Sequence, residues 1–297
     1  MYDITGYHEA ATLADVFTIT GEKPTARLVA GGTDVMVKAR EMKSGYVGCD
    51  LIGITRIPEL HDIYLEDDGT LVIGAMNTFS EIEHHPLIKA HLHLLGEAVA
   101  LVGGPQTRNV GTIGGNVCNG ATSADSAPTL FAYNAVLEVH SSAGIKNVSI
   151  ADFYKGAGWV DLSPGEILVK IKISRQDYEG YTGHYTKFAQ RQALDIANLS
   201  CSTLVKQTDG IIEDLRICFG VAAPTPIRMY TAEAFARGLT ITDENLKAIG
   251  AKCLEDTNTR DSWRASKEYR DYLVSILPGR NIVEALKVSA TKKEEQG

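Results

Sequence analysis

The sequence predicts an α+β protein with two domains, and three observations support this expectation. The chain has 297 residues, about twice the usual length of a single domain. Short apolar runs typical of strands alternate with amphipathic segments typical of helices along most of its length. Towards the C-terminus, strand-like runs come first and helical segments follow, an order typical of an antiparallel sheet that packs against helices.

Composition and charge narrow the possible partners. Hydrophobic residues make up 44% of the chain and charged residues 22%, so it can bury ordinary hydrophobic cores. The formal net charge is −8 and no run of Lys or Arg exceeds two residues, which argues against a nucleic-acid partner. We expect no membrane partner, because no stretch approaches the roughly eighteen apolar residues of a membrane span. The start of the sequence also lacks the pattern of a signal peptide.

The cysteines indicate a reduced, cytoplasmic protein that has no metal site of its own. They are scattered, odd in number and without a C-x-x-C pair: Cys49, Cys118, Cys201, Cys218 and Cys253. This spacing does not suit a disulfide scaffold, a zinc site or an iron–sulfur cluster. We therefore expect any metal in this system to lie on another chain.

The first half of the chain is predicted to mix helices, strands and one long loop. A helix is expected at 12–20, and the apolar run 28–30 leads through two glycines to a second helix capped by Thr33 or Asp34. Strands are expected at 46–54, 71–75, 135–140 and 166–173. Between them, residues 78–102 show helical periodicity interrupted by a histidine-rich loop. The Gly- and Asn-rich stretch 103–125 is predicted to be a long functional loop.

The second half is predicted to form a separate unit. The polar segment 175–181 is the candidate domain boundary, and strands of an antiparallel sheet are expected at 199–206 and 215–221. Helices follow at 243–256, with Asp243 as the cap, and at 262–290. Trp159 and Trp263 are expected to be packing residues. The charged segment 291–297 is expected to be a flexible tail.

The first candidate binding motif is the turn Gly31–Asp34 between an apolar strand and a helix. Glycines let backbone N–H groups approach a phosphate without a Cβ in the way, and the start of a helix favours an anion. A simple tight turn between strand and helix has the same sequence pattern. The motif alone leaves both interpretations open.

The second candidate motif lies in the stretch Gly104–Asp125. Gly114 and Gly115 stand beside Thr112, Asn116 and Asn119, a mixture of exposed backbone and short polar side chains that suits a loop around a pyrophosphate. The carboxylate of Asp125 is expected to accept hydrogen bonds from a ribose or ribityl hydroxyl or from a backbone N–H. A structural Ω-loop remains the alternative.

Together, the segments Ala30–Asp34, Arg108–Asn119 and Ser123–Asp125 resemble the two FAD-binding signatures of the flavin subunits of molybdenum hydroxylases. That family includes the FAD subunits of xanthine, carbon monoxide and nicotinate dehydrogenases. The resemblance continues through residues 166–168 and 187–197. Residues 220–228 and 262–270 most resemble bacterial xanthine dehydrogenase FAD-binding subunits.

The resemblance implies a fold. An FAD-binding domain of the vanillyl-alcohol oxidase type spans residues 1–176, with subdomains of about 1–56 and 57–176 that hold the cofactor between them. An α+β domain with an antiparallel sheet and helices follows at 177–290.

The resemblance also implies which residues bind FAD. The first pyrophosphate loop comprises Arg27, Leu28, Val29, Ala30, Gly31, Gly32, Thr33 and Asp34. The second comprises Thr112, Ile113, Gly114, Gly115 and Asn116, completed by Asn119 and Asp125. Leu168 is expected near the flavin and Lys187 close to its ring system.

Three further positions depart from the family pattern or have competing roles. Val102 stands where some relatives place an aromatic residue that stacks on the cofactor. Cys118 falls beside the isoalloxazine and is interpreted as a small apolar filler rather than a redox group. Asp195 matches a residue near the nicotinamide acceptor, although Leu194 breaks the acidic pair of the relatives. A turn cap is the competing role of Asp195.

The implied function is electron transfer. The resemblance implies that a molybdopterin large subunit oxidises the substrate and that a small subunit with 2Fe–2S clusters relays the electrons. FAD in this chain then passes them to NAD.

 No catalytic acid or base and no metal ligand is expected in this chain, because flavin chemistry belongs to the cofactor. Xanthine or another purine is the expected substrate of the complex.

Three alternatives remain open at this point. The chain can serve a nicotinate, other N-heterocycle or aldehyde hydroxylase that uses another electron acceptor. It can be a stand-alone flavin reductase of the same FAD-binding fold, such as the reductase that acts on enolpyruvyl sugar nucleotides. It can also be a scaffold that kept the fold and lost the flavin, although the intact glycine and asparagine loops argue against this.

Overall fold

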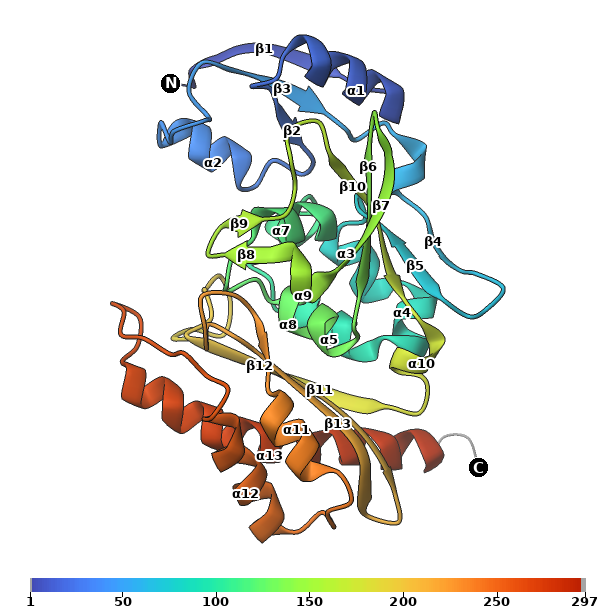
Figure 1. Cartoon of the computed structure of the whole chain (residues 1–297), viewed down its shortest axis with the longest axis vertical. Coiled ribbons are helices and arrows are strands. Elements are labelled where there is room, and N and C mark those ends of the chain that lie inside the picture. Colours follow the sequence, from blue (N-terminus) through green and yellow to red (C-terminus); the bar gives the residue numbers. More distant parts are fainter. Residues whose placement is uncertain (1, 295–297) are drawn as a thin grey trace.

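The computed structural model describes residues 2–294, with side chains described for residues 2–287. Three parts follow one another along the chain and along the long axis of the molecule: an N-terminal lobe, a middle lobe and a C-terminal domain (Figure 1). Three clusters of buried apolar side chains correspond to these parts. The helices and antiparallel sheets confirm the predicted α+β class.

The N-terminal lobe is built on a small parallel sheet with the strand order β1-β3-β2. Its elements are β1 (Ile4–Glu9), α1 (Leu13–Glu22), β2 (Arg27–Val29), α2 (Val35–Arg40) and β3 (Cys49–Gly53). Helix α1 confirms the predicted first helix and begins after a capping box formed by Thr12 and Asp15. The predicted strand at 46–54 begins three residues later than expected, at Cys49.

The middle lobe contains an antiparallel sheet with the strand order β4-β5-β10-β6-β7. Its strands are β4 (Ile63–Leu65), β5 (Leu71–Gly74), β6 (Val136–Ser141), β7 (Gly144–Ser149) and β10 (Ile167–Ile173), with a hairpin of β8 (Tyr154–Gly156) and β9 (Trp159–Val160). Its helices are η1 (Pro58–Leu60), α3 (Phe79–His84), α4 (Pro86–His91), α5 (His93–Ala100), α6 (Pro105–Arg108), α7 (Ile113–Asn119), α8 (Ser126–Ala132) and α9 (Ile150–Phe153). The α-helices gather on one side of the sheet (Figure 1), whereas Leu60 of η1 packs into the core of the N-terminal lobe.

The stretch 103–125 is not one long loop, which corrects the prediction. It contains the short helices α6 and α7. Thr112 caps α7 by accepting a hydrogen bond from the Gly115 N–H, and Gly120 ends the helix in a left-handed conformation with φ of 64°. Glycine and asparagine have low helix propensity, so composition alone concealed this helix.

The C-terminal domain confirms the predicted antiparallel sheet, whose strand order is β11-β12-β13-β14. Helix α10 (Arg175–Tyr178) leads into β11 (Thr182–Phe188), β12 (Leu199–Thr208), β13 (Ile211–Gly220), β14 (Ile227–Arg228), α11 (Tyr230–Ala236), α12 (Asp243–Cys253) and α13 (Lys267–Glu294). Helices α11 and α13 pack on one face of the sheet, and α5 and α8 of the middle lobe pack on the other (Figure 1). The sheet is therefore shared between two cores.

Several details of this domain differ from the predictions. Thr242, not Asp243, caps α12, because its side chain accepts a hydrogen bond from the Asn245 N–H. Helix α13 starts at Lys267 and continues through Glu294, and residues 295–297 of the predicted tail lie outside the described residues. The expectation that Trp159 and Trp263 are packing residues is wrong, since they are 66% and 80% exposed.

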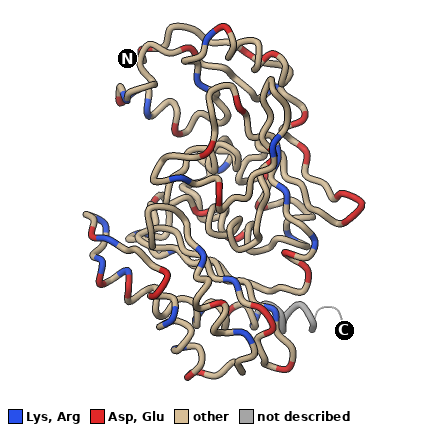
Figure 2. Tube along the Cα trace, viewed as in Figure 1, with Lys and Arg blue, Asp and Glu red and all other residues tan. Residues whose placement is uncertain are grey.

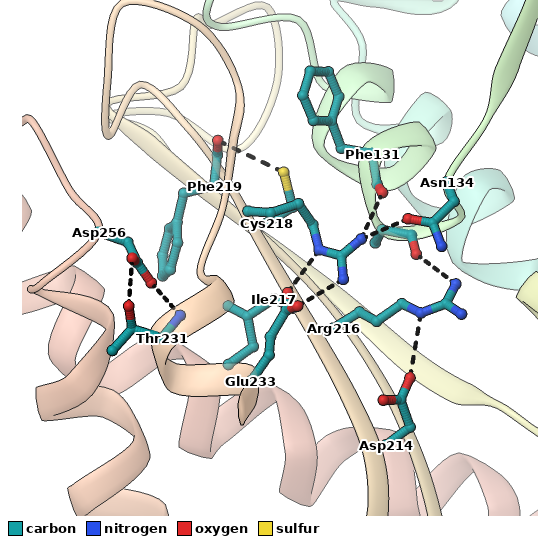
Figure 3. Close-up of polar contacts among 12 residues, drawn as sticks. Phe131, Asn134, Asp214, Arg216, Ile217, Cys218, Phe219, Thr231, Glu233 and Asp256 are labelled. Atoms are coloured by element: carbon teal, nitrogen blue, oxygen red, sulfur yellow. Dashed lines mark hydrogen bonds and ion pairs between the residues drawn. The ribbon is translucent and has the colours of Figure 1, made fainter. Parts of the chain in front are cut away.

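Two buried arginines join the C-terminal sheet to the middle lobe (Figure 3). Arg216 donates to the carbonyl oxygen of Ala132 at 3.1 Å, and Arg228 donates to that of Phe131 at 3.2 Å. Both carbonyls belong to the last turn of α8, where cations are favoured by the unpaired carbonyl groups. The arginines thereby fix α8 between the two domains.

Candidate cofactor-binding site

A cleft of about 410 Å³ lies between the N-terminal lobe and the middle lobe. Its walls come from α2 and the turns around it, from α7, and from residues 158–168 before and within β10. This volume is in the usual range of small-molecule sites. The cleft is the larger of two hollows that contain predicted binding residues.

Most of the predicted FAD-binding residues line this cleft. They are Arg27, Leu28, Ala30, Gly32, Thr33, Asp34, Thr112, Gly114, Gly115, Asn116, Cys118, Asn119 and Leu168. Three others, Val29, Gly31 and Ile113, are absent from its lining and stand next to residues that form it. The structure thus brings the two sequence motifs, about eighty positions apart, to opposite walls of one cleft.

The first loop offers unpaired backbone donors. Within the described chain, the backbone N–H groups of residues 31–34 donate to no protein acceptor. Gly32 has a φ of 71°, a conformation that favours glycine. Gly31 also meets a packing requirement, because a Cβ there would lie 1.7 Å from the Val110 carbonyl oxygen. It allows the two loops to approach each other, and the free N–H groups beside it suit a phosphate.

The second loop differs from the expected cradle of free N–H groups. The Ile113 N–H donates to the Asn77 carbonyl at 3.0 Å, and the Gly114 N–H donates to the Ala75 carbonyl at 2.9 Å. The Gly115 N–H is taken by the Thr112 hydroxyl at 3.1 Å. This loop therefore presents few free backbone donors to a ligand.

Two asparagine side chains supply donors on that wall instead. The Asn116 side-chain oxygen accepts from Ser126 at 2.7 Å, and that of Asn119 accepts from Lys38 at 2.6 Å. Among the described residues, neither side-chain NH₂ group donates to a protein acceptor. Both amides line the cleft, so their NH₂ groups can donate to a ligand.

A second hollow of about 310 Å³ adjoins the cleft at Asn116, which lines both. Its walls include the predicted residues Val102, Asp125 and Asp195. Leu168 and Cys118, which the resemblance also places near the flavin ring, face the main cleft instead. The predicted ring-side residues are thus divided between two adjoining hollows, except Lys187, which is not among the lining residues of either.

Lys187 forms a buried ion pair beside the second hollow. Its ammonium donates to Asp125 at 2.8 Å and to the Leu101 carbonyl at 2.9 Å, and the two charged side chains are 9% and 7% exposed. Tyr185 donates its hydroxyl to the other oxygen of Asp125 at 2.7 Å. Burial raises the pKa of Asp125, while Lys187 and Tyr185 oppose that rise.

Asp125 has partners within the protein. Its two carboxylate oxygens accept hydrogen bonds from Tyr185 and Lys187. These contacts fix the position of the Lys187 ammonium next to the hollow. Burial raises the pKa of Tyr185 well above its usual value, so its hydroxyl stays protonated and remains a donor.

Cys118 has the features of a packing residue. Burial raises the pKa of its thiol to about 12, so the thiolate needed for redox chemistry is disfavoured at neutral pH. This supports the predicted role of an apolar filler. Val102 packs partly buried against the middle core and provides no aromatic surface for stacking.

Asp195 ties together the turn that it belongs to. Its carboxylate accepts from the backbone N–H groups of Gln190 and Arg191, both at 2.9 Å. Partial burial raises the pKa of Asp195, but hydrogen bonds from Ile196, Arg191 and Gln190 outweigh this effect and the pKa is lowered overall. The geometry therefore favours the turn-capping role over direct contact with an acceptor.

Sequence reasoning missed Lys38, Tyr46 and Tyr185. Lys38 lines the cleft four positions after Asp34, a spacing that places both side chains on the same face of a helix. Tyr46 lines the cleft from the segment before β3. Tyr185 carried no signal in the sequence, because its partner Asp125 is 60 positions away.

Neither a cluster of potential metal ligands nor a membrane-spanning helix is found in the part of the chain that the structure describes. No group of three or more His, Cys, Asp or Glu side chains there is placed to hold a metal ion. No described helix is both long enough and apolar enough to cross a membrane.

Comparisons with known proteins agree with this arrangement. Residues 2–175 match the FAD binding domain in molybdopterin dehydrogenase, and residues 184–285 match the CO dehydrogenase flavoprotein C-terminal domain. The chain is 40% identical to the xanthine dehydrogenase FAD-binding subunit of Escherichia coli O157:H7, with 98% of this chain and 99% of that protein covered. It is 31% identical to the nicotinate dehydrogenase FAD-subunit of Eubacterium barkeri, with 74% and 75% covered.

Solved structures give the same result for the fold. A chain of the carbon monoxide dehydrogenase from Hydrogenophaga pseudoflava superimposes with a TM-score of 0.90 at 26% identity, covering 97% of this chain and 99% of that chain. The two family matches account for nearly all of the sequence, in the order of the two domains. This chain therefore belongs to the FAD-binding subunits of the molybdenum hydroxylase family, in which the lobes described above bind FAD.

Proposed function

We propose that this chain transfers electrons from a small subunit with 2Fe–2S clusters to NAD, within a cytoplasmic xanthine dehydrogenase complex. In this proposal a molybdopterin large subunit oxidises the purine substrate. The high identity to xanthine dehydrogenase FAD-binding subunits over nearly the full length supports the purine substrate more than the lower identity to the nicotinate relative does. We propose that residues 1–176 form the FAD-binding domain and that residues 177–290 form the C-terminal α+β domain.

One observation carries the proposal: free polar donors in the cleft lead to a second hollow lined by Asp125, whose carboxylate is paired with the buried ammonium of Lys187. Backbone N–H groups of residues 31–34 and the amides of Asn116 and Asn119 suit the diphosphate of FAD. Asn116 connects this region to the hollow beside Lys187, where we place the flavin end. When bound there, FAD supplies the electron-transfer chemistry.

The residues around the hollow then have distinct roles. Lys187 supplies a fixed positive charge that stabilises negative charge added to its neighbourhood, an effect strengthened by burial. Asp125, Tyr185 and the Leu101 carbonyl hold the ammonium in place. The turn containing Asp195 forms another part of the wall.

The proposed function predicts two properties of the purified protein. The isolated chain should contain one non-covalent FAD, released by heat and identified by mass spectrometry, and should oxidise NADH with an artificial dye as acceptor. Co-expressed with its partners, it should purify in a complex that contains iron, sulfide and molybdenum and reduces NAD with a purine as donor.

Different failures identify different errors. A chain loaded with FAD that shows no NADH–dye activity would exclude NAD as the acceptor. Hydroxylation of nicotinate or an aldehyde, but not of purines, by the complex would replace the substrate assignment. Reduction of an organic substrate by the isolated chain would favour a stand-alone flavin reductase.

Asp195→Ala separates the capping role from contact with the acceptor. Because both carboxylate oxygens already hold backbone N–H groups, we expect a melting temperature a few degrees lower and a KM for NADH within about threefold of the wild type. Flavin content should stay unchanged. A rise in KM of tenfold or more at unchanged stability would show that this carboxylate contacts NADH.

A further inference from the structure

A cluster of two cations and one aromatic ring forms part of the cleft wall in the N-terminal lobe. The guanidinium of Arg27 lies 5.3 Å from the centre of the Tyr46 ring, and the ammonium of Lys38 lies 5.4 Å from it. All three side chains line the cleft. Cation–π contacts of this kind restrict the positions of the long side chains.

Lys38 also connects the two lobes. Its ammonium lies 2.6 Å from the Asn119 side-chain oxygen on α7 and 2.6 Å from a carboxylate oxygen of Asp34. The Lys38 side chain is 23% exposed, so solvent screens its charge only in part. Its ammonium contacts both α7 and the first loop. An ammonium has three N–H donors, and these contacts use two of them.

The charges around the cleft show why this lysine matters. Its lining contains two cations, Arg27 and Lys38, and two carboxylates, Asp34 and Glu166. Glu166 is paired with Lys146, which lies outside the lining. Asp34 adjoins the free N–H groups of the first loop and would repel a diphosphate there. Lys38, in contact with Asp34, is the cation placed to offset that repulsion.

We propose that Lys38 is the counter-cation of the FAD diphosphate and holds α2 against α7 around it. The proposal rests on FAD binding in this cleft and assigns a residue that the two glycine motifs do not contain. Tyr46 is a positioning residue for the ammonium. Arg27 holds the segment that carries Tyr46 by donating to the Gly45 carbonyl at 2.8 Å.

The test compares Lys38→Met and Lys38→Arg with Lys43→Met in the full chain. Lys43 is a matched control because it is 55% exposed, pairs with Glu41 and lies outside the cleft lining. After removal of the flavin, the dissociation constants of FAD and ADP are measured by calorimetry at two salt concentrations. Thermal melting of each apoprotein checks that it is folded.

We expect Lys38→Met to weaken both FAD and ADP by roughly ten- to a hundredfold, as for the loss of a charged hydrogen bond. The remaining binding should depend less on salt, because one cation is missing. Lys38→Arg keeps the charge and should recover most of the affinity. Lys43→Met should bind like the wild type.

Three results would overturn the proposal. Lys38→Met that binds FAD within twofold of the wild type, even with a lower melting temperature, would reduce Lys38 to a bridge between lobes. Equal losses in Lys38→Arg and Lys38→Met would exclude a role for the charge. Equal losses in Lys38→Met and Lys43→Met would indicate a nonspecific electrostatic effect. Absence of FAD binding in the wild type would instead refute the binding function itself.

Discussion

Gly115→Val is expected to give a folded protein that purifies with less than about a tenth of the wild-type flavin. Gly115 lines the cleft in the first turn of α7. A Cβ there would approach the Thr112 hydroxyl to 2.9 Å and the Ala30 methyl to 3.8 Å, so the branched methyls fill the gap between the two loops. A backbone without a side chain is needed where protein and phosphate meet closely.

The ratio of flavin absorbance at about 450 nm to protein absorbance measures the loss, and thermal melting measures any effect on the fold. Gly21→Val is the matched control, because Gly21 also lies in a helix and a Cβ there meets no atom within 4 Å. It should retain full flavin. Full occupancy in a stable Gly115→Val protein would show that the second loop does not border the cofactor.

The glycine turns were predictable from sequence because their backbone requirements are local. Gly32 adopts a positive φ within the turn 31–34, and the glycine pair in the sequence predicts such a conformation directly. The role of Gly31 was not predictable in the same way. Its close contact is with the Val110 carbonyl, some eighty positions away, which only the packed lobes bring near.

Strand β11 illustrates a second limit of prediction from the sequence. Its residues alternate between buried and partly exposed positions, and the polar ones conceal the pattern in the sequence. Tyr185 and Lys187 both reach Asp125 because β11 pairs with β12 in a register that sets Tyr185 opposite Ser202. The ion pair with Asp125 joins the two domains across 62 positions of sequence, so it could not be derived from spacing.

The overall distribution of charged residues could be predicted from the sequence better than the β11 contacts could. Acidic and basic residues are interspersed along the whole trace (Figure 2), which agrees with the absence of long cationic runs in the sequence. The individual pairs did not follow from composition. Lys38 is one of 29 Lys and Arg residues, and only its position on α2 distinguishes it as a candidate ligand for a diphosphate.

Arg228→Met is expected to lower the free energy of unfolding by about 3–5 kcal/mol. This is the usual cost of leaving one member of a buried ion pair without its partner. Arg228 donates to both carboxylate oxygens of Glu233, at 2.6 and 2.7 Å, and the two residues are 8% and 9% exposed. Burial opposes the charge of Arg228, but hydrogen bonding to Glu233 raises its pKa overall. Glu233, labelled in Figure 3, also accepts a hydrogen bond from the backbone N–H of Ile217.

The same substitution also removes a contact with the flavin-binding part of the molecule. Arg228 donates to the Phe131 carbonyl and to Asn134 at 2.7 Å, both at the end of α8. Helix α8 begins directly after Asp125, which holds Lys187 at the second hollow. We therefore expect Arg228→Met to lose flavin at a lower urea concentration than the wild type, in parallel with its unfolding.

Two further variants distinguish the buried charge from the loss of packing. Arg228→Met combined with Glu233→Met removes both charges and should recover much of the lost stability, since an apolar pair can replace a buried ion pair. Arg237→Met removes an arginine that is 69% exposed and pairs with Asp214, so it should cost less than about 1 kcal/mol. Urea unfolding of all three variants gives the comparison. If the double variant is as unstable as Arg228→Met alone, the contacts of Arg228 with α8, rather than the unpaired Glu233 carboxylate, account for the effect.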